Sequence, residues 1–369
     1  MKRLMLFALF AAPAFCAWPN GYAYRSTITI DPSRVSGTSD LANFPLLVSL
    51  TDNDLKNTGN GGRVVNSSGY DIVFASDASG STPLFWEIES YDGAAGSGVF
   101  WVKVPAVSHT ASTTIYMFYG KAGVSAFQST ASSVWDANYK AVWHLKETTN
   151  GPYADSTASG LTLTGTSTRG TGEIGSGQVF DGSSNALSVS DGATLDFVSG
   201  DFTLEYWVSP TSNSTRQLLQ TKGLYAYGGY YIDFGADASV SLACEAPGAE
   251  SRITAPAAYD AGAWQHFVIV RAAGGDAIYK NGQALTLSAD ACTIASASNS
   301  ATVIGSYSVP AFFLGGSADE IRMSNVARSA GWVGTEYHNQ QSPGAFYSVT
   351  FGATPGVSNA VVQGQVILW

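Results

Sequence analysis

Short runs in which apolar and polar residues alternate occur along most of this chain, and they predict β-strands. Between residues 24 and 120 these runs are rich in Ile, Val, Tyr, Phe and Thr, and Gly, Asp, Asn or Pro bounds them. They read YRSTITI, FPLLVSL, YDIVFAS, LFWEIES, GVFWVKVP and STTIYMFYG. Strands at this regular spacing indicate an antiparallel β-sandwich, whose core we expect Trp86 and Trp101 to fill.

A second series of strand patterns follows the low-complexity segment NGPYADSTASG, residues 150–160, which is predicted to be a linker or the first loop of a second domain. Asn281-Gly282 within this series is a strong hairpin signal. Residues 325–340 predict one helix, with Asn325 as its N-cap. Its apolar residues fall roughly on one face: Val326, Trp332, Val333 and Tyr337. The pattern as a whole predicts an all-β protein.

Composition sets the number of domains and excludes some partners. The 369 residues are too many for one ordinary core, so two domains are expected. Apolar residues make up 45% of the chain and charged residues 12%, which supplies cores and argues against disorder. The formal charge of −10 argues against binding to nucleic acid or to anionic membranes.

The first residues have the features of a secretory signal peptide. Lys2 and Arg3 form a basic start, Leu4 to Ala12 form a short apolar stretch, and cleavage is expected before Ala17. Residues 1–16 are therefore predicted to be removed, and the mature chain to be secreted, periplasmic or displayed at the cell surface. No later stretch reaches the ~20 apolar residues that a membrane helix needs.

Two cysteines remain after residue 16, Cys244 and Cys292. In an oxidising compartment we expect them to form a single disulfide, and two buried free thiols are the alternative. Their spacing matches no zinc-binding pattern.

The second half of the chain resembles a known family in five consecutive blocks. The blocks are FDGSSNALSV, GDFTLEYWVSP, AGAWQHFVIVR, AIYKNGQAL and GGSADEIRMSNVARSAGW, in that order. Over residues 140–349 they resemble the LamG-like, concanavalin A-like jellyroll domains of bacterial secreted proteins. This resemblance implies two curved antiparallel sheets packed face to face.

The first half resembles a second family, DUF2341, through GYDIVFAS, LFWEIESYDG, GVFWVKVPAV, TTIYMFYGKAG and VWDANYKAVWHLKE. We assign residues 17–139 to it. The family has no agreed function and commonly precedes a LamG-like domain in exported bacterial proteins. The remaining residues, 350–369, are expected to form a last strand or a tail. Together the two resemblances imply two tandem antiparallel β-sandwiches, the second a jellyroll.

The acidic pair Asp319-Glu320 is the first candidate for catalysis. In an extended strand neighbouring side chains alternate between faces, so these two carboxylates are expected to diverge and not to act on one bond. The predicted faces are Ala318, Glu320 and Arg322 on one side and Asp319, Ile321 and Met323 on the other. Glu320 and Arg322 then form a surface ion pair of little energetic value.

A structural calcium ion is the only cofactor that we expect. The LamG-like resemblance implies that Asp319 is a candidate calcium or loop-bracing ligand, with Asp181 as its candidate partner. Calcium takes six to eight oxygen ligands, so loop carbonyls would have to contribute. The alternative is that Asp319 only accepts backbone hydrogen bonds.

Other catalytic arrangements have little support. Glu87 and Glu89 project from one face of a predicted strand, as a retaining glycosidase pair or as the solvated face of a half-buried strand, and we favour the second. The four histidines form no zinc motif, and His144 and His266 are expected to pack inside strands. No serine-hydrolase or phosphate-loop motif occurs. The chain is therefore predicted not to be an enzyme.

Aromatic residues indicate a binding surface instead, because exposed rings stack on sugar rings while nearby polar groups bind hydroxyls. The predicted ligand-binding residues are Tyr225, Tyr227, Tyr230, Tyr231 and Asp233. The alternative is that these tyrosines are half-buried strand residues or only decorate a hairpin. Phe312 and Phe313 would form a second apolar loop.

The function predicted from these features is recognition. The chain is expected to be a secreted, non-catalytic module that binds a glycan or a cell-envelope protein. The alternative comes from DUF2341 relatives that precede proton-channel subunits. In that case the chain is the exported structural or sensory region of a Ton/Tol-type energy-transduction complex and makes protein contacts only.

Overall fold

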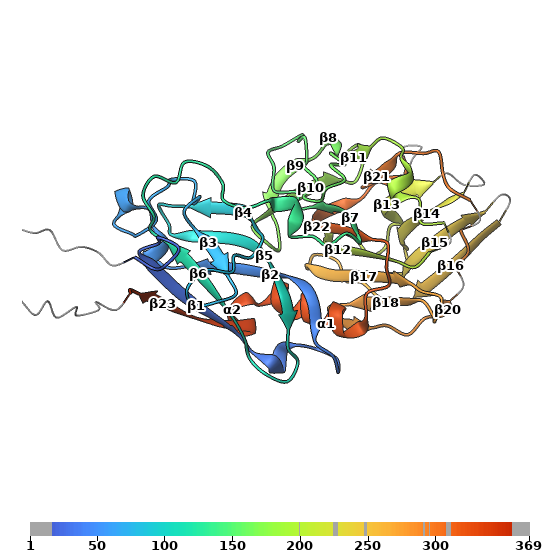
Figure 1. The fold of residues 1–369 in the computed structure, drawn as a ribbon. Coiled ribbons are helices and arrows are strands. Elements are labelled where there is room, and N and C mark those ends of the chain that lie inside the picture. Colours follow the sequence, from blue (N-terminus) through green and yellow to red (C-terminus); the bar gives the residue numbers. More distant parts are fainter. Residues whose placement is uncertain are drawn as a thin grey trace, which may run out of the picture.

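The computed structural model describes residues 17–355, except residues 199, 224–227, 247–248, 291, 295 and 308–310. The predicted signal peptide therefore lies outside the described residues, as do residues 356–369 of the tail. Figure 1 shows two β-sandwiches packed against each other along the long axis of the molecule. Nearly every strand pairing is antiparallel, and the predicted all-β class is confirmed.

The first sandwich packs a four-stranded sheet, ordered β23-β1-β6-β3, against a three-stranded sheet, ordered β2-β5-β4. Trp86 is 2% exposed and packs on Phe74 in the core between them, as predicted. Trp101 is also buried, but it stacks on His144 and so faces the jellyroll, which corrects its predicted place. The strands are β1 (Tyr24–Ile30), β2 (Leu41–Thr51), β3 (Val73–Ala75), β4 (Trp86–Asp92), β5 (Ser97–Val107), β6 (Thr113–Tyr119) and β23 (Tyr347–Ala353).

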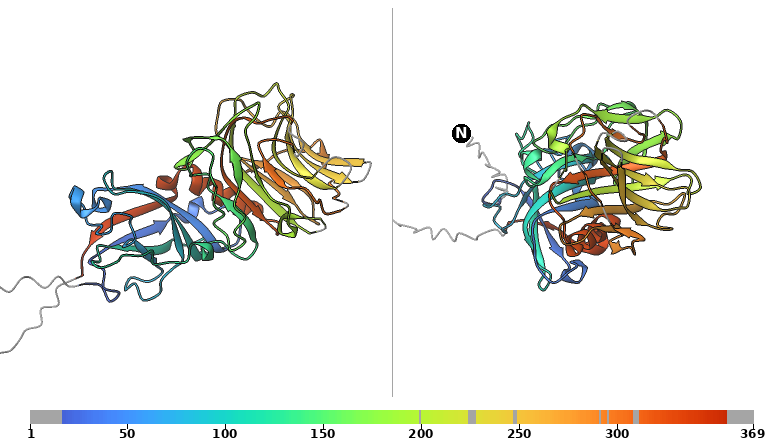
Figure 2. Two further views of the ribbon diagram at one scale, coloured as in Figure 1. Left: turned by 90° about the horizontal axis from the view of Figure 1, so that it is seen from above. Right: turned by 90° about the vertical axis from the view of Figure 1, so that its right-hand side faces the viewer.

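The last strand of the chain belongs to the first sandwich. β23 pairs with β1, with Thr350 opposite Thr27 and Tyr347 opposite Ile30. The boundary predicted at residue 349 is therefore corrected, because the strand that begins at Tyr347 returns to the first domain. Figure 2 shows β1 and β23 together at the end of the molecule away from the jellyroll. The chain thus passes from the first sandwich into the jellyroll and then returns to the first sandwich.

The jellyroll consists of two sheets. The proximal sheet, ordered β19-β18-β17-β12-β22-β10-β9 with β7 also paired to β22, faces the first sandwich, and the distal sheet is ordered β20-β16-β15-β14-β13-β21-β11-β8. The strands are β7 (Tyr139–Trp143), β8 (Thr164–Thr166), β9 (Thr168–Thr171), β10 (Ser176–Asp181), β11 (Ala186–Val189), β12 (Phe202–Pro210), β13 (Gln217–Gly223), β14 (Gly229–Phe234), β15 (Val240–Ala246), β16 (Ala249–Ala255), β17 (Gln265–Arg271), β18 (Ala277–Lys280), β19 (Gln283–Ala284), β20 (Ala289–Asp290), β21 (Thr302–Ile304) and β22 (Gly315–Ser324).

Two features of the jellyroll settle alternatives left open by the sequence. Residues 150–160 form the first loop of the domain, because Tyr153 is fully buried in its core and Asp155 accepts a hydrogen bond from the Val142 amide. Cys244 of β15 and Cys292 form the predicted disulfide, with their Cα atoms 5.3 Å apart. Both cysteines lie in the same core, so the disulfide ties the end of the distal sheet to the following loop.

Helix α1 (Ala330–Gln341) confirms the predicted helix, and the short helix α2 (Pro343–Phe346) follows it. Ser329, and not Asn325, caps α1 by accepting a hydrogen bond from the Trp332 amide. The helix is wedged between the two domains. Trp332 packs on Phe44 of the first sandwich, whereas Val333 packs on the proximal sheet of the jellyroll.

Candidate functional site

A β-bulge in β22 determines where the acidic pair points. β22 pairs with β12 so that Arg322 lies opposite Glu205 and Asp319 lies opposite Trp207, which leaves two residues of β22 opposite Tyr206. Glu320 sits in this bulge with a φ of 50°, in the left-handed region that a side chain seldom adopts. The bulge breaks the alternation of faces along the strand.

The prediction that Asp319 and Glu320 diverge is therefore wrong. Ala318, Ile321 and Met323 face the jellyroll core. Glu320 and Arg322 turn toward the first sandwich, and Asp319 lies on the same side under the turn between β9 and β10. Glu320 and Arg322 also do not form a surface ion pair. Their side chains are at most 1% exposed, and the guanidinium lies 2.8 Å from the carboxylate.

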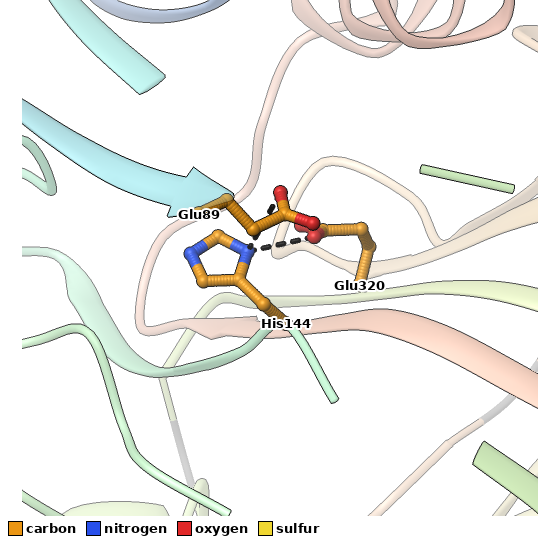
Figure 3. A group of neighbouring side chains, drawn as sticks. All are labelled: Glu89, His144 and Glu320. Carbon is orange, nitrogen blue, oxygen red and sulfur yellow. Dashed lines mark hydrogen bonds and ion pairs between the residues drawn. The ribbon is translucent and has the colours of Figure 1, made fainter. Parts of the chain in front are cut away.

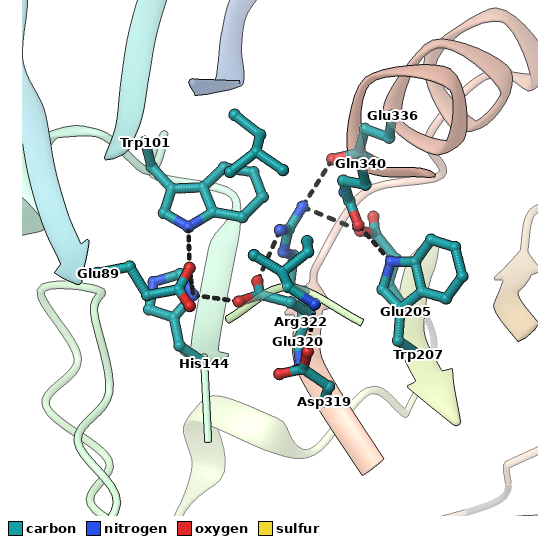
Figure 4. A network of polar contacts seen from close by, with 12 residues as sticks. Glu89, Trp101, His144, Glu205, Trp207, Asp319, Glu320, Arg322, Glu336 and Gln340 are labelled. Atoms are coloured by element: carbon teal, nitrogen blue, oxygen red, sulfur yellow. Dashed lines mark hydrogen bonds and ion pairs between the residues drawn. The ribbon is translucent and has the colours of Figure 1, made fainter. Parts of the chain in front are cut away.

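These side chains belong to a buried ionic cluster between the two sandwiches (Figure 4). We use this name for Glu87, Glu89, His144, Glu205, Asp319, Glu320, Arg322 and Glu336. The first two come from β4 of the first sandwich, and the last comes from α1. The other members come from the jellyroll. Each member is at most 6% exposed, so the cluster fastens one domain to the other out of contact with water.

His144, which directly follows β7, is the centre of one half of the cluster. Its Nδ1 lies 2.7 Å from Glu320 Oε1, and its Nε2 lies 3.1 Å from Glu87 Oε1. Indole nitrogens complete this shell, because Trp135 Nε1 donates to Glu87 and Trp101 Nε1 donates to Glu89. The predicted packing of His144 inside a strand therefore misses its ionic role.

Protons keep this half of the cluster near neutrality. Burial, which alone would lower the pKa of His144, is outweighed by the carboxylates of Glu320 and Glu87, and the pKa is raised to about 10. Burial, with a further contribution from Glu320, raises the pKa of Glu89 to about 8. Burial likewise raises the pKa of Asp319 well above its ordinary value. At neutral pH His144 is therefore charged and Glu89 is mostly protonated, and burial favours the protonated form of Asp319.

Arg322 is the centre of the other half. Its guanidinium lies 2.8 Å from Glu320, 3.3 Å from Glu336 of α1 and 3.9 Å from Glu205. The same group lies over the rings of Trp101 and Trp135, at 4.3 Å and 5.0 Å from their centroids. One arginine thus joins α1, the proximal sheet and the aromatic core of the first sandwich, through ion pairs and cation–π contacts.

The role that this arrangement supports is a structural one, namely holding the two domains together. Glu87 and Glu89 are 4% and 6% exposed, so their predicted place on a solvated face is wrong. A substrate could reach them only if the two sandwiches separated, which argues against a retaining glycosidase pair. His266 is also buried, as predicted, and burial lowers its pKa to about 3. The sequence signal for the cluster was two glutamates placed within the apolar run LFWEIES.

The predicted calcium ligands lie in different environments. Asp319 is buried and accepts a hydrogen bond from the Ile174 amide at 2.9 Å. Asp181 is exposed and accepts from the amides of Ser183, Ser184 and Asn185, which shapes the turn after β10. Asp319 therefore makes the kind of backbone hydrogen bond that was its alternative role, and Asp181 accepts backbone hydrogen bonds as well. A calcium ion at these two residues stays a prediction.

A lysine ammonium already fills an oxygen-lined site at the edge of the jellyroll. The Lys222 side chain is 1% exposed, and its Nζ donates to Asp191 and to the carbonyl oxygen of Ser300. Asp196 lies 3.1 Å from the same nitrogen. The ammonium of this β13 residue therefore ties together two connections, the one between β11 and β12 and the one that precedes β21, which is a task that loop-bound cations commonly perform.

Replacing Lys222 with methionine is expected to lower the free energy of unfolding by about 2 kcal/mol, because several charge-assisted hydrogen bonds are lost. Chemical denaturation monitored by tryptophan fluorescence measures the change. The matched control is Lys280→Met, whose partner Asp260 is largely exposed. The control is expected to change stability by less than about 0.5 kcal/mol. Equal effects of the two substitutions would contradict the assignment.

The predicted sugar-binding tyrosines are only partly placed as expected. Tyr225 and Tyr227 lie outside the described residues. Tyr230 is 1% exposed in the jellyroll core and donates to the carbonyl oxygen of Leu195, so it is not a surface platform. Tyr231, on the opposite face of β14, lies in a pocket on the distal sheet. Asp233 is also buried, in ion pairs with Arg216 and Arg252.

The distal pocket has a volume of about 270 Å³. Its lining is Arg216, Leu218, Tyr231, Glu245, Glu250, Arg252, Tyr307 and Phe312. Arginine side chains lie over the ring of Tyr231. Arg216 also lies over one face of the Phe312 ring, 4.5 Å from its centroid, and Phe312 is 45% exposed. The pocket thus combines one partly exposed aromatic ring with charged groups on the distal sheet. A larger cavity of about 580 Å³ beside Lys140 contains a single aromatic residue, Phe197, which is only 7% exposed.

Comparisons with known proteins support the domain order. Residues 68–140 match the domain of unknown function DUF2341, and residues 181–334 match the concanavalin A-like lectin/glucanases superfamily. This order and the jellyroll architecture are those predicted from the sequence. No curated protein matches the chain. Within the described residues, no helix has the length and apolar character needed to cross a membrane.

Two solved structures are similar to part of the chain. The receptor-binding domain of botulinum neurotoxin type G has 12% sequence identity and a TM-score of 0.43, with 55% of this chain and 52% of that chain covered. The binding domain of Paraclostridial mosquitocidal protein 1 has 14% identity and a TM-score of 0.44, with 54% and 52% covered. The chain spans about half the length of these structures.

Proposed function

We propose that this chain, in which a DUF2341 segment precedes a concanavalin A-like jellyroll, is a secreted, non-catalytic module that binds glycan through the distal pocket. The superfamily description joins lectins with glucanases, so it does not decide between binding and hydrolysis. The observation that carries the proposal is the placement of charged and aromatic groups. The carboxylates between the domains are buried, whereas the distal pocket opens on an exposed ring.

The pocket suits a sugar of neutral charge. Phe312 offers an apolar ring for stacking, and Glu250 and Arg252 offer acceptors and donors for hydroxyl groups beside it. Arg216 and Arg252 are already paired with Asp233. An anionic ligand would have to compete with this carboxylate, so we expect neutral glycans to be preferred. Secretion agrees with the disulfide, which is typical of oxidising compartments.

Replacing Phe312 with alanine is expected to weaken glycan binding at least tenfold, because loss of one accessible stacking ring removes about 1.4 kcal/mol or more. Stability should hardly change, since the ring is 45% exposed. The measurement is a glycan array probed with residues 17–369, with and without a calcium chelator. Phe85→Ala removes an equally exposed ring from the first sandwich and serves as the control.

The outcomes separate the possibilities. Retention of the parent and of Phe85→Ala, with loss in Phe312→Ala, supports the distal pocket. Equal retention of all three proteins would contradict it. Loss of parent binding after chelation would support the predicted calcium ion.

A structural role in an envelope complex is the second candidate. It is favoured by the rigid join between the domains, in which β23 returns to the first sandwich and the buried ionic cluster fixes the jellyroll to it. Such a body would hold the jellyroll at a set distance from a partner protein. Absence of glycan binding, together with co-purification of an envelope protein that survives Phe312→Ala, would favour this role.

A further inference from the structure

Three side chains of the buried ionic cluster direct ligand atoms at one point. Glu89, His144 and Glu320 each offer an oxygen or nitrogen atom, and these atoms all lie within 4.8 Å of one another. Figure 3 shows that the three side chains, which come from β4, the end of β7 and β22, point toward one another. Segments far apart in the sequence thus converge on one small volume between the domains.

One oxygen at this point lacks a partner. Glu89 Oε2 accepts a hydrogen bond from Trp101 Nε1, but Glu89 Oε1 has no hydrogen-bond partner among the described residues, although the side chain is fully buried. In Figure 3 the carboxyl group of Glu89 faces that of Glu320. A buried carboxyl oxygen without a hydrogen-bond partner is unfavourable whether the group is ionised or protonated, so this position calls for a ligand.

The surrounding residues orient the ligand atoms. Glu87 Oε1 lies 3.1 Å from His144 Nε2 and fixes the imidazole so that Nδ1 points at Glu320. A carboxylate behind an imidazole is the usual outer shell of a metal-binding histidine. Arg322 holds Glu320 by its other oxygen, at 2.8 Å. Both residues would keep their contacts if an ion entered.

We propose that Glu89, His144 and Glu320 bind one divalent transition-metal ion of the zinc type. Zinc accepts imidazole nitrogen together with carboxylate oxygen, whereas calcium and magnesium prefer oxygen alone. The charge agrees, because four carboxyl groups surround this point, those of Glu87, Glu89, Asp319 and Glu320, and the basic side chains in contact with them are those of His144 and Arg322. A dication would offset this excess of acidic groups.

The site needs a small adjustment to admit the ion. His144 Nδ1 and Glu320 Oε1 are 2.7 Å apart, which is a hydrogen-bond distance. Two ligands about 2.1 Å from a tetrahedral zinc ion lie roughly 3.4 Å apart, so these atoms would separate by about 0.7 Å. The ion would take the place of the proton between them. It would then link β4 of the first sandwich directly to β22 of the jellyroll.

The test measures metal bound to residues 17–369. The chain is unfolded in a chelator, refolded with or without ZnCl₂, dialysed, and analysed by inductively coupled plasma mass spectrometry. We expect one zinc per chain, a higher unfolding temperature with zinc than without it, and no comparable effect of CaCl₂. Glu89→Gln should lose the zinc, and Glu87→Gln, which disturbs only the outer shell, should weaken binding about 10- to 100-fold.

The control is His109→Gln. His109 is a partly exposed histidine that also lies against a carboxylate, that of Asp40. This variant should keep its zinc. Circular dichroism first establishes that each variant is folded. X-ray absorption of the zinc protein should show one imidazole nitrogen among oxygen ligands. Absence of zinc from the refolded parent would overturn the proposal, as would loss of zinc in His109→Gln with retention in Glu89→Gln.

Discussion

Replacing Arg322 with methionine is expected to lower the free energy of unfolding by about 3–5 kcal/mol, which is the usual result of removing one partner from a buried ion pair. Methionine fills a similar volume, so packing changes little. The carboxylates of Glu320 and Glu336 lose the guanidinium that lies 2.8 Å and 3.3 Å from them. They remain buried without compensation, and the cation–π contacts with Trp101 and Trp135 disappear as well. Chemical denaturation measures the loss.

Two further variants show whether the lost stability comes from the ion pairs of Arg322. Arg322→Lys keeps the charge but not the planar fork, and should recover only part of the stability. Arg271→Met removes a half-buried arginine that donates a hydrogen bond to the carbonyl oxygen of Gly200, and should change stability by less than about 1 kcal/mol. If Arg322→Met were as mild as Arg271→Met, the cluster would not be what joins the domains.

Stability is expected to change little between about pH 4.5 and 6.5, where Glu89 and His266 act in opposite directions, and to fall steeply above pH 6.5. Burial raises the pKa of Glu89 from 4.5 to about 8, and the neighbouring carboxylates raise that of His144 from 6.5 to about 10. Between pH 6.5 and 8 the folded chain therefore binds more protons than the unfolded chain at both residues. These two contributions are complete below the unfolded-state pKa values and are lost as the pH rises through about 8 and 10.

Each additional proton held by the folded chain corresponds to a loss of about 1.4 kcal/mol per pH unit. His266 acts in the opposite sense, because burial lowers its pKa to about 3, and its contribution to stability falls as the pH drops below 6.5. Between pH 4.5 and 6.5 this change offsets that of Glu89. The measurement is the free energy of unfolding from pH 5 to pH 9.5, in a chelating buffer.

Glu89→Gln is the matched variant, since glutamine has the shape of the protonated acid. It should be close to the parent at pH 5, lose stability less steeply between pH 5 and 8, and exceed the parent at pH 9. A stability that increases between pH 6.5 and 9 in the parent would contradict the protonation assigned to the cluster.

Much of the fold was predictable because it rests on local patterns. Alternation, turn residues and the hairpin signal at Asn281-Gly282 predicted most of the strands. The helix was predicted, but its cap was misplaced because Ser329 and Asn325 are both good N-caps. Local patterns could not predict which strands pair when they lie far apart in the sequence. Nothing near Tyr347 indicates that β23 would pair with β1, more than 300 positions earlier in the sequence.

The candidate site was harder to predict because it depends on one irregular residue. Strand alternation would hold for Asp319 and Glu320 if no bulge added a residue to the strand. The left-handed position of this bulge is occupied by Glu320 and not by a glycine, so the sequence does not mark it. Burial of acids was missed for a related reason. Glutamates within an apolar strand are ordinarily solvated. Their partners here come from the second domain, because His144 pairs with a glutamate of β4 and Arg322 pairs with a glutamate of α1.

The central claim is that the buried ionic cluster and β23 make the two sandwiches one cooperative body. Differential scanning calorimetry of residues 17–369 at pH 6 tests it most directly. The account predicts a single transition in which the calorimetric and van't Hoff enthalpies agree. Two separate transitions in the parent protein, one for each sandwich, would contradict it.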